Sequence, residues 1–283
     1  MKKEAILVKA FTKNPKEGNP AGVVFEADDL SKVEKQEIAS TLGFSESAFV
    51  SHSDKADFKV EFFSPKVQVP MCGHATIATF HALVEHGYLG IKVDSTVSTQ
   101  ETLAGIVSVE CRNNGLITMT QQDPQFLGTD YDLETIANLL SIDSSSLSSE
   151  TPIELVSTGT PKLMIPVKTL EGLFQIKPKL KAISNFCEQS NVRGFYPFTT
   201  ETQNDEADFH ARQFNPLAGI DEDPLTGIAA GALGAYVVKH QIKADSSFVI
   251  EQGYFMEMGG NIYVDIGEEV KVGGYAVEFG VKK

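Results

Sequence analysis

The chain has 283 residues, 42% of them hydrophobic, and its 24 basic and 38 acidic residues give a net charge of −14. This acidic balance opposes binding to a phosphate backbone, so nucleic acid is not an expected partner. The apolar content suffices for one large core or two ordinary ones. No apolar stretch approaches the ~20 residues of a membrane helix, and the run at 5–8 is too short for a signal peptide. We therefore expect a cytoplasmic protein without a membrane partner.

The chain contains three cysteines, Cys72, Cys111 and Cys187. This is an odd number, and their spacing is not that of a metal site, so a reduced compartment is the simpler interpretation. The sequence also carries no phosphate loop, no dinucleotide-binding glycine pattern and no metal-ligand cluster. We therefore assign no cofactor and no metal.

In chain order, the sequence predicts an α+β protein in which short strands outnumber helices. Ser31 and Glu34 form a capping box and Gly43 is a fitting stop, which predicts a helix at 32–42. Further helices are predicted at 73–85, 133–140 and 227–238. The main predicted strands lie at 5–8, 21–25, 48–51, 58–63, 106–110, 116–120, 153–156, 163–167, 194–198, 209–214, 248–251, 261–266 and 275–279.

In the two long helices, the stretches 75–84 and 227–238 carry small and apolar residues on nearly every face. A helix of this kind is surrounded by protein, and among short strands it implies a β-roll or barrel wrapped around a central helix. Its first turn presents unpaired N–H groups and partial positive charge, which favour a substrate carboxylate or a developing enolate. These two helix starts are therefore candidate binding sites.

The same unit occurs twice in the chain, at a constant offset of 154 residues. The matched pairs are Gly73 with Gly227, Ala75 with Ala229, Ala78 with Ala232 and His86 with His240. A period this long indicates duplicated domains, not a solenoid. We predict one lobe over 1–122, to which the last strand at about 272–283 can return, and a second lobe over 123–271.

The two copies differ in chemistry where their buried helices begin. The first presents Cys72 and His74, and the second presents Asp223 and Thr226. On the residues alone, a lone histidine is more often a satisfied structural group, and Asp223 is more often a cap or turn residue. A buried packing role for Cys72 is as frequent as a reactive one.

Glu46 lies in a segment that the sequence predicts to be extended. The two-residue period places it on one face with Phe44, Ala48 and Val50. A carboxylate on such an apolar face has its pKa raised by desolvation, as proton transfer near neutral pH requires. From the residues alone, a solvated glutamate at a strand end is the commoner case.

Several motifs together resemble one known family along the whole chain. They are Gly18-Asn19-Pro20-Ala21-Gly22-Val23, Phe44-Ser45-Glu46-Ser47-Ala48-Phe49, Phe63-Ser64-Pro65, Met71-Cys72-Gly73-His74-Ala75-Thr76, Gly159-Thr160-Pro161, Glu222-Asp223-Pro224-Leu225-Thr226-Gly227 and Glu251-Gln252-Gly253. In this combination the chain resembles the phenazine-biosynthesis-like PhzF family, whose fold is that of diaminopimelate epimerase. The resemblance implies two pseudo-symmetric lobes with a cofactor-free active site between them, isomerase activity on a small molecule, and a homodimer.

The resemblance also implies roles for individual residues. Glu46 matches the family's catalytic glutamate, while His74 and Asp223 match substrate-contacting positions. Gly73 and Gly227 are expected to let the backbone approach the substrate. Cys72 and Thr226 match the paired catalytic cysteines of diaminopimelate epimerase, and only one of the two thiols is kept. A two-thiol racemisation is therefore disfavoured.

Ile228 departs from the family pattern, in which Asp-Pro-Ala-Thr-Gly-Ser is common and a serine stands at this position. The change removes a hydroxyl from a substrate-binding position, so three functions stay open. The first is a cofactor-independent isomerase in which Glu46 moves the proton of a small carboxylate. The second is an amino-acid epimerase or dehydratase that uses Cys72 and Thr226. The third is a catalytically silent protein that binds a small ligand.

Overall fold

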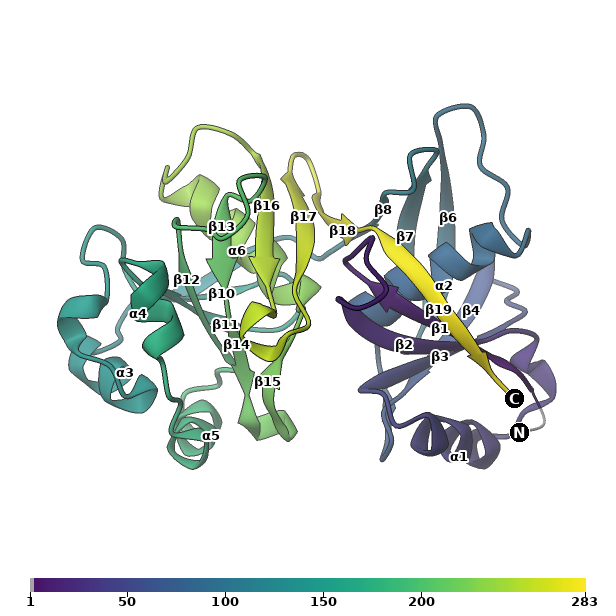
Figure 1. The fold of residues 1–283 in the computed structure, drawn as a ribbon, viewed down its shortest axis with the longest axis horizontal. Helices are drawn as coiled ribbons and strands as arrows, with labels where there is room; N and C mark the ends of the chain where they lie inside the picture. The colour runs from purple at the N-terminus through teal and green to yellow at the C-terminus, as the bar shows by residue number, and fades with distance from the viewer. Residues whose placement is uncertain (1–2) are drawn as a thin grey trace. The chain divides into compact units, whose positions relative to one another are not determined.

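The computed structural model describes residues 3–283 and divides into two compact units. Among the described residues, unit 1 comprises those up to Thr120 together with Gly273–Lys283, and unit 2 comprises Gln121–Val272. The end of the chain thus returns to unit 1, where its last strand lies beside the first (Figure 1). Among the described residues, no helix has both the length and the apolar character needed to cross a membrane.

Unit 1 is built from strands, two α-helices and one short 3-10 helix. The strands are β1 (Ala5–Ala10), β2 (Asn19–Val24), β3 (Glu46–Ser51), β4 (Phe58–Phe63), β5 (Gln68–Val69), β6 (Ser95–Thr102), β7 (Gly105–Arg112), β8 (Ile117–Thr120) and β19 (Ala276–Lys282). The helices are η1 (Ala27–Asp29), α1 (Lys32–Leu42) and α2 (Gly73–Glu85).

Unit 2 contains more helices around a similar set of strands. The strands are β9 (Gln125–Gly128), β10 (Glu154–Ser157), β11 (Lys162–Pro166), β12 (Phe195–Thr199), β13 (Phe209–Ala211), β14 (Gln213–Asn215), β15 (Ile220–Asp223), β16 (Ser247–Gln252) and β17 (Gly260–Ile266), and β18 (Val270–Gly274) crosses the boundary between the units. The helices are α3 (Leu133–Leu140), η2 (Ser144–Ser146), α4 (Leu170–Gln175), α5 (Leu180–Gln189), η3 (Pro216–Ala218), α6 (Gly227–Lys239) and η4 (Tyr254–Met256).

The two units pair their strands in the same order. In unit 1, β1–β2 is antiparallel, β2–β3 parallel, β3–β4 antiparallel, β4–β6 parallel and β6–β7 antiparallel. In unit 2, β10–β11, β11–β12, β12–β13, β13–β16 and β16–β17 follow the same alternation. Each parallel pair needs a crossover, and the second crossover contains α2 in unit 1 and α6 in unit 2. The helices at the start of the two sequence repeats thus occupy equivalent places in the two pairing orders.

Both crossover helices are buried on most of their surface. Helix α2 packs against β1, β2, β3, β7, β8 and β19, and α6 packs against β10, β11, β16 and β17. In α6, ten of thirteen residues are buried, and in α2 nine of thirteen. The apolar composition on every face predicted this burial, and the structure confirms it. Each helix ends at a matched histidine: His86 lies 2.9 Å from a Glu278 carboxylate oxygen, and His240 lies 2.7 Å from one of Glu154.

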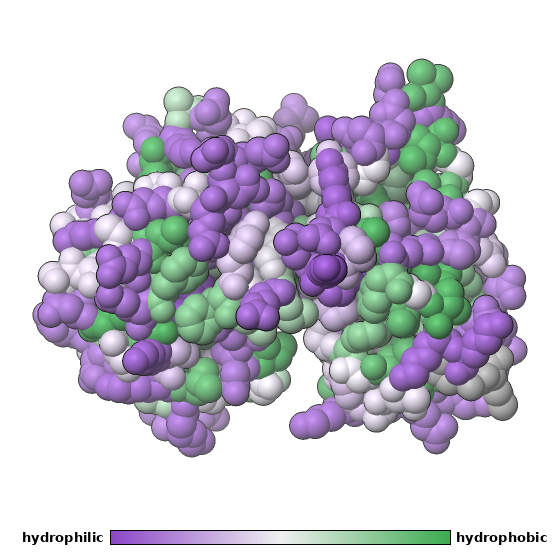
Figure 2. All heavy atoms as spheres, viewed as in Figure 1, coloured by the Kyte–Doolittle hydropathy of each residue, from purple (hydrophilic) through white to green (hydrophobic). Residues whose placement is uncertain are grey.

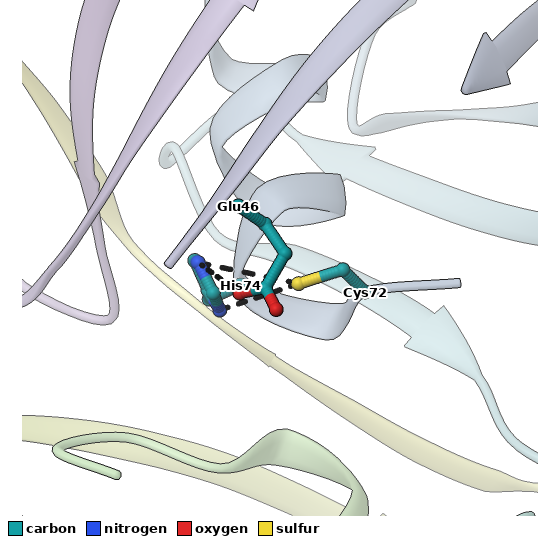
Figure 3. Close-up of side chains that lie close together, drawn as sticks. All are labelled: Glu46, Cys72 and His74. Atoms are coloured by element: carbon teal, nitrogen blue, oxygen red, sulfur yellow. Dashed lines mark hydrogen bonds and ion pairs between the residues drawn. The ribbon is translucent and has the colours of Figure 1, made fainter. Parts of the chain in front are cut away.

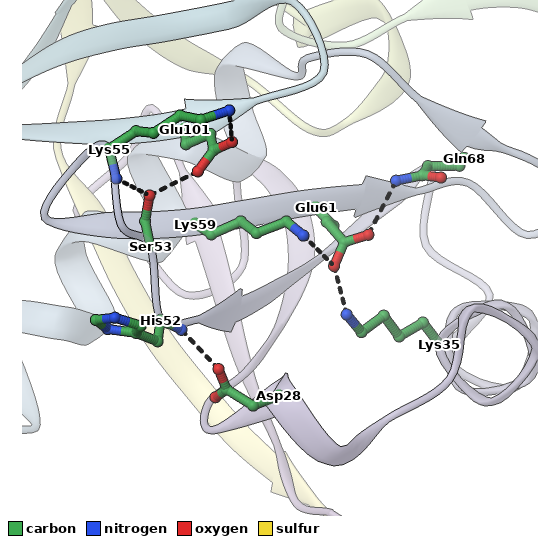
Figure 4. A network of polar contacts seen from close by, with 9 residues as sticks. All are labelled: Asp28, Lys35, His52, Ser53, Lys55, Lys59, Glu61, Gln68 and Glu101. Atoms are coloured by element: carbon green, nitrogen blue, oxygen red, sulfur yellow. Dashed lines mark hydrogen bonds and ion pairs between the residues drawn. The ribbon is translucent and has the colours of Figure 1, made fainter.

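Polar contacts tie the strands of unit 1 to α1 and to one another (Figure 4). Lys35 of α1 is 7% exposed and forms an ion pair with Glu61 of β4, whose other carboxylate oxygen accepts a 3.2 Å hydrogen bond from Gln68. Ser53 donates a 2.6 Å hydrogen bond to Glu101 of β6. Because buried charges are costly unless paired, the Lys35–Glu61 ion pair holds β4 against α1.

The surface of each unit is mainly hydrophilic. In the view of Figure 2, hydrophilic residues cover most of each unit, with small hydrophobic groups between them. Exposed apolar side chains include Phe279 and Val281 on β19. Isolated groups of this size are normal on a folded protein.

Candidate functional site

Glu46, Cys72 and His74 come together in unit 1 because a strand start meets a helix start. Glu46 is the first residue of β3, which runs parallel to β2. In this pairing Glu46 lies opposite Ala21 of β2. Cys72 is the N-cap of α2 in an extended conformation, and its side chain does not cap the helix. His74 follows in the first turn. The buried helix thus holds two of the three side chains, and the strand holds the third.

The three side chains form a compact cluster (Figure 3). The Nε2 atom of His74 lies 3.6 Å from Glu46 Oε2 and 3.3 Å from the Ser45 hydroxyl oxygen. The Cys72 sulfur lies 3.4 Å from His74 Nδ1. His74 and Cys72 are buried, and the Glu46 side chain is 16% exposed. The Glu46 carboxyl is thus largely desolvated but still reachable from solvent.

Burial raises the pKa of the Glu46 carboxyl above its usual range. Hydrogen bonds from Ser45 and Cys72 oppose this shift but do not cancel it. The direction agrees with the expectation from the apolar character of the surrounding strand. A carboxyl whose pKa is displaced toward neutrality exchanges protons in both directions more readily at the pH of a cell.

Among the residues that the structure describes, Glu46, Cys72 and His74 bring their potential ligand atoms within 4.8 Å of one another, close enough to hold a metal ion. One ion takes one nitrogen of an imidazole. The Cys72 sulfur lies 3.4 Å from His74 Nδ1 and 4.0 Å from Nε2, and Glu46 Oε2 lies 3.6 Å from Nε2. His74 Nε2 is therefore within reach of both other side chains.

A second polar cluster lies in unit 2 around Asp223 and Thr226. The Thr226 hydroxyl donates a 2.5 Å hydrogen bond to Asp223 Oδ2. Gln252 donates from Nε2 to the Asp223 carbonyl at 2.7 Å and to the Thr226 hydroxyl at 3.2 Å. Tyr196 donates to Gln252 Oε1 at 2.9 Å. Like Cys72 in unit 1, Thr226 is the N-cap of a buried helix and does not cap it with its side chain.

The remaining predicted positions lie at the same two helix starts. At Gly73, an added Cβ would find only the Met119 sulfur, at 4.0 Å, so the glycine leaves open space beside the helix. Gly227 is buried, and its carbonyl accepts a 3.0 Å hydrogen bond from Gln121. Ile228 is half-buried in the first turn of α6, and its carbonyl oxygen lies 3.1 Å from the Thr158 hydroxyl oxygen.

Sequence reasoning gave no role to Ser45, Gln252 or Tyr196. Ser45 and Gln252 lie within two of the motifs that carry the family resemblance, so these motifs could have identified them as site residues. Tyr196 lies on β12 in a run of buried residues, and nothing in its neighbourhood distinguishes it from a core aromatic. Only the contact with Gln252, 56 residues away, reveals its place in the cluster.

Comparisons with known proteins match this chain over most of its length. A sequence model of the family described as phenazine biosynthesis-like protein matches residues 8–280. The uncharacterized isomerase YfhB of Bacillus subtilis (strain 168) is 36% identical over 269 residues, which cover 94% of this chain and 91% of that protein. Trans-2,3-dihydro-3-hydroxyanthranilate isomerase of Pseudomonas fluorescens is 30% identical over 254 residues, 88% of this chain and 84% of that protein.

Solved structures also match this chain over nearly its whole length. The crystal structure of a PhzF-family phenazine biosynthesis protein from Bacillus anthracis matches with a TM-score of 0.90 and 32% identity, covering 99% of this chain and 98% of that one. A hydroxyproline epimerase from Agrobacterium vitis matches with a TM-score of 0.66 over 99% of this chain and 90% of that one. At 13% identity, this second match shows a shared fold only. The chain therefore has the mixed helix-and-strand fold common to these proteins, and the prediction of a mixed fold is confirmed.

Proposed function

The chain belongs to the phenazine biosynthesis-like PhzF family, whose relatives include named isomerases, and from this premise we propose that it is a cofactor-independent isomerase. Its substrate would be a small molecule that bears a carboxylate, and the reaction would move a proton at carbon. The observation that carries the proposal is the Glu46 carboxyl, which is desolvated, has a raised pKa and lies against His74 at the start of a buried helix.

In this proposal Glu46 takes a proton from one carbon atom of the substrate and returns it to another. His74 orients the carboxylate through its 3.6 Å contact with Oε2, and Ser45 holds the imidazole from the same side. The N–H groups in the first turn of α2 carry partial positive charge, which would stabilise the substrate carboxylate or the negative charge that develops as the proton leaves.

The finer architecture is part of the same proposal. We infer that units 1 and 2 are two related lobes of the diaminopimelate epimerase type, because their strands pair in the same order and their buried helices begin at matched glycines. We also propose that Asp223 and Thr226 are substrate-binding residues. The homodimer, and a small molecule as substrate partner, stay predictions.

The decisive experiment measures deuterium incorporation from D2O into trans-2,3-dihydro-3-hydroxyanthranilate, the compound named for the Pseudomonas fluorescens relative. We expect incorporation with the wild-type protein and a loss of at least about 100-fold with Glu46→Gln, since general acid–base catalysis contributes roughly 10²–10⁴-fold. Glutamine keeps the shape of the side chain but cannot exchange a proton, so the loss would report the chemistry and not the packing.

Glu110→Gln is the matched control, because Glu110 is 17% exposed, close to the 16% of Glu46, and lies in unit 1 on β7. We expect Glu110→Gln to retain wild-type incorporation. Equal losses in both variants would contradict the role of Glu46. A ligand-induced rise in melting temperature without any incorporation by the wild type would instead indicate a silent binding protein.

A second candidate function is an amino-acid epimerase or dehydratase in which Cys72 reacts. It is favoured by one observation, the 3.4 Å contact between the Cys72 sulfur and His74 Nδ1, which is the arrangement of a thiol beside a base. Iodoacetamide would separate the candidates. Inactivation that a bound ligand prevents, together with full loss in Cys72→Ala, would favour this second function, whereas the first predicts that Cys72→Ala keeps measurable deuterium incorporation.

A further inference from the structure

Four side chains of unit 2 form a continuous hydrogen-bond chain that ends at a carboxylate. Tyr196 donates to Gln252, Gln252 donates to Thr226, and Thr226 donates to Asp223. The donor–acceptor distances are 2.9, 3.2 and 2.5 Å in that order. This hydrogen-bond chain joins side chains from β12, the end of β16 and the start of α6.

The orientation of the Gln252 amide is set by two backbone groups whose polarity cannot change. The Asp223 carbonyl accepts from Nε2 at 2.7 Å, and the Thr226 N–H donates to Oε1 at 3.4 Å. If the amide were rotated by half a turn, its oxygen would face a carbonyl oxygen and its NH2 would face an N–H group. Both contacts would be repulsive, so only one orientation satisfies the two backbone groups.

The amide orientation in turn sets the direction of the Thr226 hydroxyl. One hydrogen of Nε2 points to the Asp223 carbonyl, and the other points to the Thr226 oxygen. A hydroxyl that accepts from this side gives its own single hydrogen elsewhere, and Asp223 Oδ2 is 2.5 Å away. Thr226 is therefore a donor to the carboxylate.

The first member of the chain is a permanent donor. Tyr196 is fully buried, and burial raises the pKa of its hydroxyl, with the nearby charge of Asp223 acting in the same direction. Gln252 is 1% exposed, so water does not compete for its amide. Threonine at an N-cap usually bonds to its own helix, yet the Thr226 side chain makes no capping bond and serves Asp223 instead.

We propose that Gln252 is a positioning residue of the candidate site. It fixes the direction of the Thr226 hydroxyl, and this hydroxyl holds the Asp223 carboxylate in one orientation toward the substrate. The inference rests on the proposed function in that Asp223 meets the substrate. It also assigns Thr226 the role of a hydrogen-bond donor, which is incompatible with Thr226 as the proton-accepting base of an epimerase.

The first test needs no substrate. In protein labelled with ¹³C-threonine, the wild type is expected to show a slowly exchanging hydroxyl proton coupled to Thr226 Cβ. Gln252→Leu removes the amide, and we expect this proton to exchange at least about ten-fold faster, as follows from the loss of the hydrogen bond that orients it. Tyr196→Phe removes one oxygen atom and keeps the other members of the hydrogen-bond chain, so we expect a smaller acceleration of the exchange of the Thr226 hydroxyl proton. This variant tests the proposal if Gln252→Leu does not fold.

The matched control is Tyr236→Phe. Tyr236 is also fully buried in unit 2, and its hydroxyl donates to the Pro152 carbonyl at 2.7 Å. Neither residue belongs to the hydrogen-bond chain from Tyr196 to Asp223. We expect Tyr236→Phe to leave the exchange of the Thr226 hydroxyl unchanged. Equal protection of this hydroxyl in wild type, Gln252→Leu and Tyr196→Phe would overturn the proposal.

The second test measures turnover of trans-2,3-dihydro-3-hydroxyanthranilate. We expect Tyr196→Phe to lower kcat roughly three- to ten-fold, the effect of one hydrogen bond that acts on the reacting geometry, with a smaller change in KM. Tyr236→Phe is expected to keep the wild-type kcat, and equal losses in both variants would overturn the positioning role. If the wild type does not convert this compound, the proposed function fails for that substrate, and the hydroxyl exchange alone decides the role of Gln252.

Discussion

Glu46 is held in an environment that favours its neutral form. Its carboxyl has a raised pKa because desolvation outweighs the hydrogen bonds from Ser45 and Cys72. In an unfolded chain the pKa of a glutamate is near 4.5. The carboxyl is therefore mostly ionised in the unfolded chain at a pH where Glu46 of the folded protein still keeps its proton. The same burial that suits proton transfer therefore makes ionisation of this residue costly to the fold.

This predicts a pH-dependent stability difference between wild type and Glu46→Gln. Since the folded state binds the proton more tightly than the unfolded state, the contribution of the neutral glutamate is fully present below the unfolded pKa. It is lost as pH rises through the raised folded pKa. We expect the free energy of unfolding of wild type, relative to Glu46→Gln, to fall between about pH 4.5 and the folded value, measured by urea titration. A difference that is constant with pH, or that grows as pH rises, would contradict the raised pKa.

Ile228 offers a test of substrate choice. It stands in the first turn of α6, next to the Gly227 helix start, where a serine hydroxyl is common in the family. If this side chain meets the substrate, Ile228→Ser should tighten binding of trans-2,3-dihydro-3-hydroxyanthranilate roughly three- to ten-fold, because one added hydrogen bond is worth ~0.5–1.5 kcal/mol. Calorimetric titration of wild type and Ile228→Ser checks this. Unchanged affinity would mean that residue 228 does not contact the ligand.

At the scale of elements, prediction succeeded where the signal is local. Helix α1 has the predicted bounds, because Ser31 and Glu34 make both hydrogen bonds of the capping box and Gly43 ends the helix at φ +73°. Strand β6 was not predicted, since Ser95–Thr102 is mostly polar and is held by its pairing with β7. Helix α5 was missed because Lys179 gives no N-cap signal, although its buried residues Ile183 and Cys187 recur at helical spacing. Of these two elements, only β6 depends on contacts that the local sequence does not encode.

Close packing at the buried helix α6 gives a prediction at this scale. A Cβ on Gly231 would lie 2.1 Å from the Gln121 amide oxygen and 2.9 Å from Val272 Cγ2. The same amide accepts from Thr158 at 2.6 Å and donates to the Gly227 carbonyl. We expect Gly231→Ala to lower the free energy of unfolding by about 1–3 kcal/mol, as overpacking does, in spite of the better helix propensity of alanine.

A double-mutant cycle tests the cause. Gln121→Ala removes the amide that the new methyl group would meet, so Gly231→Ala should cost less in that background than in the wild type. Chemical denaturation of the four proteins gives the coupling energy. Strict additivity would show that Gln121 is not the source of the penalty.

For the whole molecule, the repeat in the sequence located the two helix starts because small residues and glycines recur at a fixed offset. It could not supply the pairing of the strands or the meeting of Glu46 with His74, 28 residues apart, since His74 lies at the start of the helix in the crossover between the parallel strands β4 and β6. The contact of Gln252 with Asp223 likewise spans 29 residues. Residue identity thus selected the candidate side chains, while the topology decided which of them touch.

The last strand makes the final test, because it belongs to the unit that the chain left at residue 120. Strand β19 pairs with β1 along its length, from Ala5 opposite Lys282 to Ala10 opposite Ala276, and it also packs on α2. Deleting residues 276–283 would turn β1 into an edge strand and uncover the buried helix. We expect faster amide hydrogen exchange in β1, β2 and α2.

The control region for this experiment lies in unit 2, which contains a hydrophobic core cluster of its own. It is formed by Ile136, Leu140, Leu155, Leu163, Ile165, Leu173, Ile183, Phe195, Phe214 and their neighbours. Peptides from this core should keep wild-type exchange after the deletion, because local opening follows the contacts that are removed. Val281→Ser, at a position 52% exposed, keeps the strand and should leave both units protected. Equal acceleration in both units after the deletion would show that they unfold as one cooperative body.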